Sequence, residues 1–537
     1  MTSGKRNVEL LKDKSLNKST AFSREERNNL GLRGLLPYVV SSQETQIKRI
    51  LGNMRRKEFD IEKYIFLSAL QDRNESLFFQ TVMENIEEIM PLIYTPTVGQ
   101  ACKEFSHIYR HAQGLYLTPP DKGEMEKLMD NWPKKDIRVI VVTDGQRILG
   151  LGDLGANGMG IPVGKLALYT ACAGIHPTRC LPVMLDVGTD NKELRDDPFY
   201  IGYPFERLKG KEYFDFVDEF VMAVQHKYPG ALIQFEDFST PNAYTLLNKY
   251  KHEVVCFNDD IQGTASVALA GIFASGRITG VPYKDLKILF LGAGSASTGI
   301  ADLMVSAFVE EGLSREEAYD RLWFVDSGGL VVKSRKDLVN HKAAYAKDHV
   351  PLNFIETIRE FRPNVLIGAT GAPGSFTQEI VELMCSINER PVIFALSNPT
   401  SRAECTAEQA YTWSDGKVVF ASGSPFDRVI YKEKIFKSGQ GNNAYIFPGL
   451  GLGVAVTKAK TVQDNLFLAA TRTLAQIVSQ EDIDRGAVYP PLKDIRSISL
   501  DIATAVAEKI YESGQARLPR PDDLRQHIAD YMYNPKY

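Results

Sequence analysis

The stretch KILFLGAGSAS, residues 287–297, contains the pattern that decides the fold of this chain. Its first part is an apolar, strand-like run that ends at Leu291. Small residues follow at once: Gly292, Ala293, Gly294, Ser295 and Ala296. A glycine loop between a parallel strand and a helix lets the backbone approach a pyrophosphate, which the helix N-terminus binds through its unpaired N–H groups. The stretch therefore predicts the dinucleotide loop of a Rossmann-type domain, with a doubly wound domain for another ligand as the alternative.

A second glycine pattern, GLGDLG at residues 150–155, matches the same motif by spacing but not by context. Asp144 and Gly145, a strong turn signal, stand between the preceding strand and these glycines. In the dinucleotide motif, the glycine loop follows the strand with no turn between them. We therefore interpret residues 150–155 as a tight turn near an active site and assign the dinucleotide to the loop at Gly292.

The next predicted strand bears on the choice of dinucleotide. It ends at Asp326, where a carboxylate can accept hydrogen bonds from the adenosine ribose. Because a carboxylate at this place repels a 2′-phosphate, the sequence favours NAD over NADP. Lys333 and Arg335 lie close enough along the chain to keep NADP open as the alternative.

The hydrophobic periodicity divides the chain into a helical part, two α/β parts and a helical tail. Apolar residues at three-to-four spacing predict helices over residues 24–110, and strand-like runs alternate with helical ones from about residue 136. The predicted fold class is therefore α/β with parallel sheets. The expected division is a helical N-terminal domain at 1–110, a central parallel-sheet α/β domain at 111–258, a Rossmann-type NAD-binding domain at 259–442, and C-terminal helices at 443–537 that pack on and complete the central domain.

The composition excludes several classes of function. The chain has 63 Lys and Arg against 67 Asp and Glu, a net charge of -4, which provides no electrostatic footprint for nucleic acid. No apolar run approaches the roughly 20 residues that cross a bilayer, so no membrane partner is expected. Six scattered cysteines without a CxxC pair indicate neither a disulfide framework nor a zinc site. With no secretory signal in the sequence, the expected location is cytoplasmic, with a mitochondrial presequence as the alternative.

Two predicted strands end in pairs of acids. Glu236 and Asp237 close the run ALIQFEDF, and Asp259 and Asp260 close the run VVCFNDD. Ligands bind at the carboxyl edge of parallel sheets, so these four side chains are predicted to converge there. Like charges that close need a counter-ion, and Mg²⁺ or Mn²⁺ with oxygen ligands meets this need. Helix N-caps and ordinary salt bridges are the alternative for any single acid.

Other polar residues carry signals with two interpretations each. Lys165 enters an apolar helix after the run GANGMGIPVG, as either a surface cation or a general base. Tyr94 lies in a proline-framed loop, where tyrosines are often half-buried anchors. Four further residues could orient a ligand or could only solvate and cap turns: Arg147, Asn398, Asn442 and Asn443.

Taken together, these motifs resemble those of the malic enzyme family, the oxidative decarboxylating malate dehydrogenases. The resemblance covers nearly the whole chain and rests on these runs: LQDRNESLFF, MPLIYTPTVGQAC, VVTDGQRILGLGDLGANGMGIPVGKLALYTACAG, LPVMLDVGTDN, IQFEDF, FNDDIQGTASVA, LGAGSAS, ALSNPT, FASGSPF and GQGNNAYIFPG. It implies that L-malate and NAD are converted to pyruvate, CO2 and NADH with the help of Mg²⁺ or Mn²⁺. It also implies a homo-oligomer, either a dimer or a tetramer of paired dimers.

The resemblance implies a role for each matching residue. Tyr94 would be the general acid and Lys165 the general base, with Asp259 hydrogen-bonded near Lys165. The metal ligands would be Glu236, Asp237 and Asp260. The malate-binding residues would be Arg147, Asn398, Asn442 and Asn443. The cofactor-binding residues would be Arg147, Asp260, Gly292, Ala293, Gly294, Ser295, Ala296, Asp326 and Asn398.

Two other functions fit parts of the same pattern. Malolactic enzyme is similar but retains NADH and releases lactate, whereas this sequence keeps the malic enzyme form of YTPTVG and GDLGANGMGIPVGK. A catalytically silent NAD-binding sensor has no need of Tyr94, Lys165 and three metal-ligand positions. We therefore expect an enzyme, specifically an NAD-dependent malic enzyme.

Overall fold

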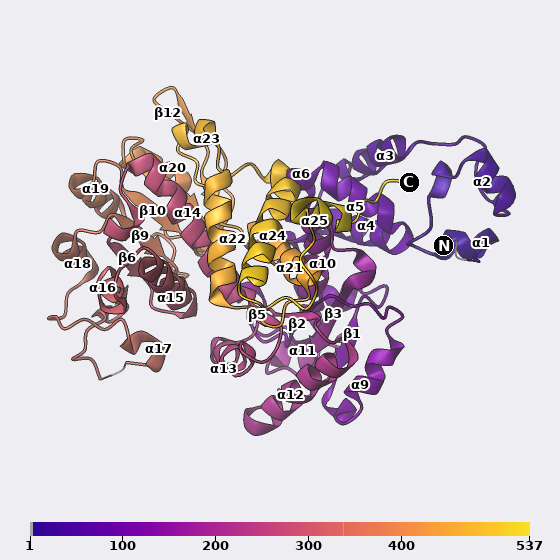
Figure 1. Cartoon of the computed structure of the whole chain (residues 1–537), viewed down its shortest axis with the longest axis horizontal. Helices are drawn as coiled ribbons and strands as arrows, with labels where there is room; N and C mark the ends of the chain where they lie inside the picture. Colours follow the sequence, from indigo (N-terminus) through magenta and orange to yellow (C-terminus); the bar gives the residue numbers. More distant parts are fainter. Residues whose placement is uncertain (1–3, 337, 399) are drawn as a thin grey trace. The chain divides into compact units, whose positions relative to one another are not determined.

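The structure, a computed structural model, describes residues 4–336, 338–398 and 400–537, apart from the side chains of Ser295 and Asn340. The chain forms two compact units (Figure 1). Unit 1 contains the residues up to Ser239 together with Pro521–Tyr537, and unit 2 contains Thr240–Arg520. The finer division predicted from the sequence, with bounds at 110, 258 and 442, stays a prediction. Within the described ranges, no helix is both long enough and apolar enough to cross a membrane.

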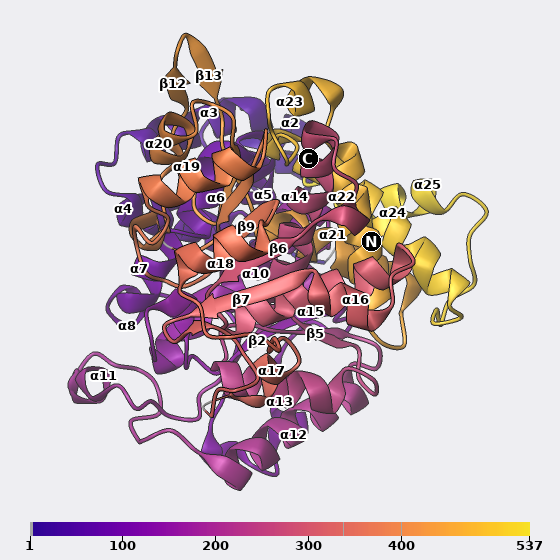
Figure 2. The ribbon, with the colours of Figure 1, turned by 90° about the vertical axis from the view of Figure 1, so that its left-hand side faces the viewer.

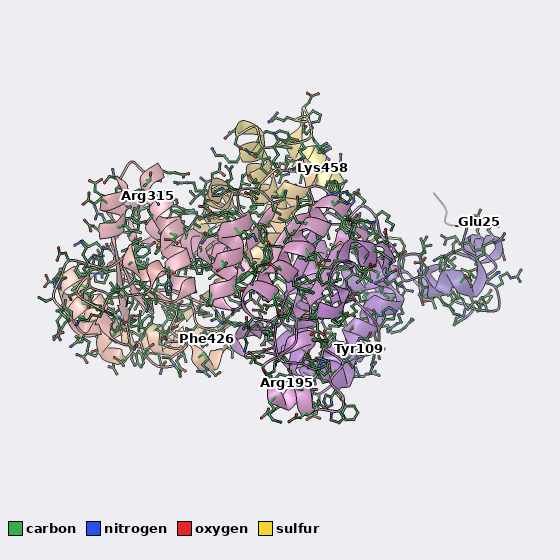
Figure 3. All side chains as sticks on the ribbon, turned by 90° about the horizontal axis from the view of Figure 1, so that it is seen from below. Glu25, Tyr109, Arg195, Arg315, Phe426 and Lys458 are labelled. Carbon is green, nitrogen blue, oxygen red and sulfur yellow. The ribbon has the colours of Figure 1, made fainter. Side chains whose placement is uncertain are left out.

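Unit 1 begins with helices, where the periodicity predicted them. They are α1 (Asn7–Lys12), α2 (Arg24–Asn29), α3 (Gln43–Arg55), α4 (Asp60–Arg73), α5 (Glu75–Glu84), α6 (Ile86–Ile93), α7 (Thr97–Lys103) and α8 (Phe105–Ile108). Leu10, Phe22 and Leu32 form a small separate core near the start of the chain. Glu25 of α2 lies on the exposed side of this segment (Figure 3).

The rest of unit 1 is a parallel sheet with its helices. The elements are β1 (Leu115–Leu117), α9 (Met125–Leu128), β2 (Val139–Thr143), α10 (Gly160–Ala173), β3 (Cys180–Leu185), α11 (Lys192–Asp196), α12 (Gly210–Lys227), β4 (Leu232–Phe235) and α25 (Leu524–Tyr531). The strands lie in the order β1-β3-β2-β4 and pair in parallel. From β2 the chain goes first to β3 and then to β4 on the opposite side. The carboxyl ends of β2 and β4 therefore border a topological switch point, where α/β sheets bind ligands.

Unit 2 contains the second α/β series. Before its larger sheet come α13 (Thr240–Tyr250), β5 (Cys256–Asn258) and α14 (Thr264–Thr279). The sheet and its helices are β6 (Ile288–Leu291), α15 (Ser295–Glu310), α16 (Arg315–Asp320), β7 (Leu322–Asp326), β8 (Gly329–Leu330), α17 (Asn340–Ala343), α18 (Phe354–Phe361), β9 (Val365–Gly368), α19 (Gln378–Ile387), β10 (Val392–Ala395), α20 (Ala407–Trp413), β11 (Val419–Ser422) and β14 (Gly439–Gln440). A hairpin of β12 (Val429–Tyr431) and β13 (Lys434–Phe436) projects from this unit (Figure 2).

The strands of this larger sheet lie in the order β14-β11-β10-β9-β6-β7-β8. They pair in parallel except for β7 with β8, which are antiparallel. Since β6 lies between β7 and β9, the chain changes direction across the sheet at β6, which makes its carboxyl end the switch point. The predicted α/β class with a Rossmann-type, doubly wound sheet is confirmed.

The helical tail of unit 2 shows close helix packing. It consists of α21 (Phe447–Thr457), α22 (Asp464–Ile477), α23 (Gln480–Asp484) and α24 (Ile495–Glu512). A Cβ atom built at Gly449 of α21 would lie 2.9 Å from both the Ile502 Cβ and the Ser499 carbonyl oxygen of α24. One built at Gly453 would lie 2.9 Å from the Ala503 carbonyl oxygen. The two helices can therefore approach this closely only because these positions lack a side chain.

We expect Gly449→Ala to destabilise the protein by about 1–3 kcal/mol, because the added methyl group collides with backbone and a branched side chain. Gly52→Ala in α3 is the matched control, since nothing lies within 4 Å of a Cβ at Gly52. In the control, the better helix propensity of Ala should be neutral or stabilising by about 0.5–1 kcal/mol. Thermal unfolding midpoints measure the difference, and equal midpoints for the two variants would contradict the packing argument.

Candidate active site

The switch point of the unit 1 sheet carries two adjacent acids. Glu236 and Asp237 directly follow β4, and only 3% and 6% of their surfaces are exposed. One carboxylate oxygen of each lies within 4.8 Å of the other. Asp237 has a φ of 56°, in the left-handed region that costs an L-residue about 1–2 kcal/mol. Backbone strain at the ligand edge of a sheet is typical of a functional position.

Lys165 lies beside Glu236 in the interior of unit 1. Its side chain, on α10, is 1% exposed, and its Nζ is 3.0 Å from Glu236 Oε1. On the other side of Glu236, the Gln234 Nε2 donates to Oε2 at 2.8 Å, and Gln234 in turn accepts from the Tyr169 hydroxyl at 2.6 Å. Of the two interpretations of Lys165 that the sequence allows, the surface cation is excluded because the side chain is buried.

Tyr94 lies next to Lys165. It directly follows α6, is 6% exposed, and its ring centroid is 5.2 Å from Lys165 Nζ. A glycine on α10 allows this approach, because a Cβ at Gly164 would lie 2.9 Å from the Ile93 carbonyl oxygen. Unit 1 therefore brings together a phenol, an ammonium and carboxylates, which are groups that can exchange protons with a substrate.

Arg147 is carried by the loop of residues 144–155, between β2 and α10. Its backbone N–H donates to the Asp237 carbonyl oxygen at 3.2 Å. The N–H of Leu149 donates to Asp237 Oδ1, also at 3.2 Å. The Arg147 side chain is exposed at this edge of the sheet, where a guanidinium can bind a carboxylate in a two-point fork. The loop therefore both contacts the strained acid and carries a cation suited to an anionic substrate.

Unit 2 carries the second pair of acids, and here the structure differs from the sequence expectation. The strand β5 ends at Asn258, and Asp259 and Asp260 begin a π-helical turn, Asp259–Gly263, instead of ending the strand. The Asn258 side chain caps this turn, because its amide oxygen accepts the backbone N–H of Ile261 at 3.0 Å. Asp259 is fully buried and accepts a hydrogen bond from Asn443 Nδ2 at 3.0 Å, whereas Asp260 is half-buried.

The two neighbouring amides have different partners. Asn442 Oδ1 accepts the N–H of Ala444 at 2.9 Å and so caps its own turn, one of the two roles that the sequence left open. Asn443 instead reaches Asp259, with its Nδ2 3.2 Å from the backbone carbonyl oxygen as well. The structure thus brings Asn443, but not the capping oxygen of Asn442, to a predicted catalytic carboxylate.

The glycine loop of unit 2 has the predicted context. β6 ends at Leu291 and α15 begins at Ser295, so the loop leaves the strand directly. Gly292 has a φ of 102°, and a Cβ there would lie 2.7 Å from the Ala369 carbonyl oxygen, so only glycine fits. Nothing lies within 4 Å of a Cβ built at Gly294, which leaves space for a ligand. Ala293 is buried and Ala296 half-buried, and the side chain of Ser295 lies outside the described residues.

Asp326, at the end of β7, is paired with two cations. Arg335 Nη1 lies 2.7 Å from Oδ1, and Lys342 Nζ lies 2.8 Å from Oδ2. Partial burial acts to raise the pKa of Asp326, but the hydrogen bonds from these cations outweigh it and lower the pKa to about 2. The group as a whole therefore carries one negative and two positive charges.

Asn398 follows β10 and is exposed, and its Oδ1 accepts from the Ser424 hydroxyl at 2.6 Å. A fully buried carboxylate, Glu404, fixes the loop that carries it. Glu404 accepts the N–H of Thr370, after β9, at 2.9 Å and the hydroxyl of Ser397, which precedes Asn398. The sequence carries no signal for Glu404, because a single acid in the run AEC fits neither a helix or strand periodicity nor a metal-ligand spacing.

Comparison with known proteins explains this set of groups. The model described as malic enzyme, N-terminal domain, matches residues 71–251, and the one described as malic enzyme, NAD binding domain, matches residues 261–511. The chloroplastic NADP-dependent malic enzyme of Flaveria pringlei is 51% identical over 533 residues, covering 98% of this chain and 82% of that protein. The chain belongs to the malic enzyme family. The resemblance found in the sequence is confirmed, and with it the oxidative decarboxylation of malate to pyruvate.

Further malic enzymes extend the comparison. The mitochondrial NAD-dependent malic enzyme of Ascaris suum is 49% identical over 542 residues, covering 100% of this chain and 84% of that protein. The crystal structure of the Entamoeba histolytica malic enzyme matches with a TM-score of 0.57 and 23% identity over 94% of this chain and 90% of that chain, which shows the fold. Because relatives named for NADP and for NAD are almost equally similar, family membership supports NAD or NADP with a divalent metal and does not choose between the dinucleotides.

We expect the left-handed backbone of Asp237 to be tolerated by Asn but not by Val. Asp237→Asn keeps a side-chain oxygen in the same position that can accept the Leu149 N–H, and Asn adopts positive φ readily. Asp237→Val introduces a β-branched side chain that disfavours this conformation, and should be less stable than Asp237→Asn by at least about 1–2 kcal/mol. Thermal unfolding midpoints of the two variants test this. Equal midpoints would show that residue 237 does not adopt a positive φ in the folded protein.

Proposed function

We propose that this malic enzyme oxidises and decarboxylates L-malate with Lys165 as the general base and Tyr94 as the general acid. The observation that supports this assignment most is the buried ion pair of Lys165 with Glu236, 3.0 Å apart, beside the Tyr94 ring. A lysine withdrawn from water, with a carboxylate and a phenol next to it, is suited to proton transfer and not to solvating a surface.

We propose Glu236, Asp237 and Asp260 as the ligands of a divalent cation. All three offer carboxylate oxygens, which suit Mg²⁺ or Mn²⁺ better than a softer metal. The Leu149 N–H on Asp237 Oδ1 orients one of these carboxylates. When bound, the cation supplies Lewis acidity to the substrate oxygens and the nicotinamide accepts the hydride.

The residues of the chain then have defined tasks in the reaction. Arg147 binds a malate carboxylate through its guanidinium. Lys165 Nζ, in its neutral amine form, takes the proton of the C2 hydroxyl as malate is oxidised to oxaloacetate. After CO2 has left, the Tyr94 hydroxyl gives a proton to C3 of the pyruvate enolate, and the Lys165 ammonium returns the proton it took to the Tyr94 phenolate. The protons taken and given balance, so that both residues end the cycle as they began it.

The polar residues of unit 2 complete the proposal. We assign Asp259 to the catalytic group together with Lys165, and Asn398, Asn442 and Asn443 to malate. The hydrogen bond of Asn443 to Asp259, at 3.0 Å, supports a coupling between a substrate-binding amide and a catalytic carboxylate. The Ser424 hydroxyl, which donates to Asn398 Oδ1, holds the second amide in one orientation.

We expect Lys165→Ala to lose malate turnover by roughly 10²–10⁴-fold, the usual contribution of a general base, while it still binds the reduced dinucleotide. Lys347→Met is the matched control, because Lys347 is another buried lysine, 9% exposed, but lies in unit 2 with its Nζ on the Tyr319 carbonyl oxygen. The assay contains L-malate, Mn²⁺ and either NAD or NADP, and measures pyruvate, lactate and reduced dinucleotide.

The same assay separates the rival functions. Pyruvate and reduced dinucleotide in equal amounts support the proposed function. Lactate without accumulating reduced dinucleotide identifies a malolactic enzyme, and no turnover with tight dinucleotide binding identifies a sensor. If Lys165→Ala keeps most of the malate oxidation rate while Lys347→Met behaves like the wild type, the base assignment is wrong.

We propose that the dinucleotide site accepts NADP at least as well as NAD. The sequence favoured NAD because a lone carboxylate at Asp326 repels a 2′-phosphate. Arg335 and Lys342, at 2.7 and 2.8 Å, outnumber that carboxylate, so the net local charge attracts a phosphate. An arginine near the end of the second strand is also the feature that accommodates NADP in Rossmann-type sites.

We expect Lys342→Gln to lower kcat/KM with NADP by roughly ten- to a hundredfold, the worth of one charged hydrogen bond, and to change kcat/KM with NAD much less. Lys333→Gln is the matched control, since Lys333 is an exposed lysine of the same segment. Steady-state kinetics of both variants, measured with NAD and with NADP, test this expectation. Equal losses with NAD and NADP would show that Lys342 does not recognise the 2′-phosphate.

Three properties inferred from the sequence stay predictions. They are a cytoplasmic location, assembly as a dimer or tetramer, and Mg²⁺ or Mn²⁺ as the cation. The relatives include proteins named as chloroplastic and as mitochondrial, so their names do not assign a compartment to this chain.

A further inference from the structure

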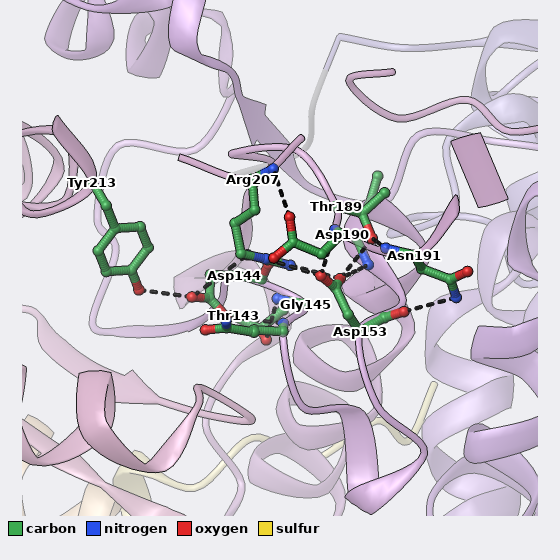
Figure 4. A network of polar contacts seen from close by, with 12 residues as sticks. Thr143, Asp144, Gly145, Asp153, Thr189, Asp190, Asn191, Arg207 and Tyr213 are labelled. Carbon is green, nitrogen blue, oxygen red and sulfur yellow. Dashed lines mark hydrogen bonds and ion pairs between the residues drawn. The ribbon is translucent and has the colours of Figure 1, made fainter. Parts of the chain in front are cut away.

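One buried arginine in unit 1 has no part in the proposed chemistry but contacts both ends of the loop 144–155. Arg207 precedes α12, and its side chain is 1% exposed. Its Nε and Nη2 donate to the two carboxylate oxygens of Asp153 at 3.0 and 2.7 Å. Its Nη1 donates to the Asp144 carbonyl oxygen at 2.9 Å (Figure 4). Asp144 directly follows β2 and Asp153 lies near the other end of the loop, so one guanidinium holds both.

Each of the two aspartates is fixed by further partners. Asp144 is fully buried, and its Oδ2 accepts the Tyr213 hydroxyl at 2.7 Å. Asp153 accepts the Thr189 hydroxyl at 2.8 Å and the Asp190 N–H at 2.9 Å (Figure 4). The network therefore ties the two ends of the loop to the segment after β3 and to α12, and nothing in it reaches the Lys165–Glu236 pair directly.

The loop between these two ends contains strained and glycine-rich backbone. Gly150 and Gly152 have φ angles of 73° and 99°, and Leu149 has a φ of 46°, which is unfavourable for a side chain of its size. Glycine-rich backbone is flexible when it is unrestrained, and a strained residue keeps its conformation only where the surroundings impose it. The loop has two backbone hydrogen bonds of its own, from the Ile148 N–H to the Gly152 carbonyl oxygen at 3.0 Å and from the Leu154 N–H to the Gly145 carbonyl oxygen at 2.9 Å. The contacts of Arg207 add a restraint at both ends of the loop.

The loop matters because of what it carries. The N–H groups of Arg147 and Leu149 bind the backbone and side-chain oxygens of Asp237, both at 3.2 Å. The Arg147 side chain is the proposed clamp for a malate carboxylate. A change in the shape of this loop therefore moves both the orientation of Asp237 and the place of the Arg147 guanidinium.

The chemistry of the network requires arginine at this position. Arg207 uses three nitrogens on three acceptors in a planar arrangement, whereas a lysine at the same place offers one point charge that cannot span both aspartates. Burial disfavours the Arg207 cation, but Asp144 and Asp153 outweigh this and raise the pKa of its guanidinium. The two aspartates therefore favour the charged form of the guanidinium that binds them.

We propose that Arg207 is a positioning residue for malate and for the divalent cation, acting through the loop 144–155 on Arg147 and Asp237. This inference rests on the function proposed above for those two residues. The loop, Arg147 and Asp237 lie in unit 1, whereas the glycine loop at Gly292 and Asp326 lie in unit 2. The effect on the dinucleotide, which Arg147 alone would transmit, should therefore be much smaller than the effect on malate.

The test compares Arg207→Lys, which keeps the charge but loses the fork, with the wild type. We expect KM for malate to rise roughly ten- to a hundredfold and the affinity for Mn²⁺ alone, measured by calorimetry, to fall by about tenfold, as expected for lost charged hydrogen bonds. KM for the dinucleotide should stay within about twofold. If Arg207 had a purely structural role, the substitution would instead reduce the folded fraction of the protein. The apparent kcat would then fall, and KM for malate and KM for the dinucleotide would both stay unchanged.

Two further variants keep the proposal falsifiable if Arg207→Lys does not fold. Tyr213→Phe removes only the hydroxyl on Asp144 and should raise KM for malate in the same direction by a smaller factor. Lys209→Met is the matched control, because its exposed ammonium, 3.0 Å from Asp190, is a cation of the same segment outside the loop contacts. It should leave both KM values and the Mn²⁺ affinity unchanged.

The outcomes are distinguishable. A folded Arg207→Lys or Tyr213→Phe with wild-type KM for malate and wild-type Mn²⁺ affinity overturns the positioning role, as does an equal rise in the KM values for malate and dinucleotide. Wild-type protein that neither binds Mn²⁺ nor turns over malate overturns the proposed function and this inference with it. Wild-type turnover with the split KM values in the variants supports both.

Discussion

The structure around the sheet of unit 1 depends on the buried ion pair of Lys165 with Glu236. Moving either ion out of water costs several kcal/mol, which their mutual attraction offsets only if the geometry is good and the remaining lone pairs are satisfied. Glu236 accordingly receives a second hydrogen bond from Gln234, which Tyr169 orients in turn. The parallel sheet makes this arrangement possible, because α10, which carries Lys165, follows β2, and β2 pairs directly with β4.

Three acids of unit 2 are likewise bound by partners from other segments. Asp259 is bound by Asn443, Glu404 by the loops after β9 and β10, and Asp326 by Arg335 and Lys342. A buried or paired carboxylate that joins two loops restricts both of them, since breaking the contact leaves a polar group unsatisfied. The loops at the carboxyl edge of this sheet are therefore held to one another as well as to their strands.

Much of this architecture could be predicted from the sequence, because the signals for it are local. The run that ends at Leu291 and the glycines after it fix a strand, a turn and a helix through residues that are neighbours in the chain. The remaining features depend on contacts between distant segments. Lys165 on α10 is buried together with Glu236, which follows β4 far along the chain, and no pattern around Arg207 reveals that it faces Asp153. The strand expected to end at Asp260 ends two residues earlier, at Asn258, whose side chain caps the following turn.

The two switch points belong to different sheets, one at β2 and β4 and the other at β6. The residues proposed to discriminate the 2′-phosphate, Asp326, Arg335 and Lys342, all lie around the end of β7 within unit 2, while the ion pair and the loop 144–155 lie in unit 1. Substitutions at these three residues can therefore change the charge around the end of β7 without altering any contact of the Lys165–Glu236 pair. The charge at one switch point and the buried ion pair at the other can evolve independently of each other.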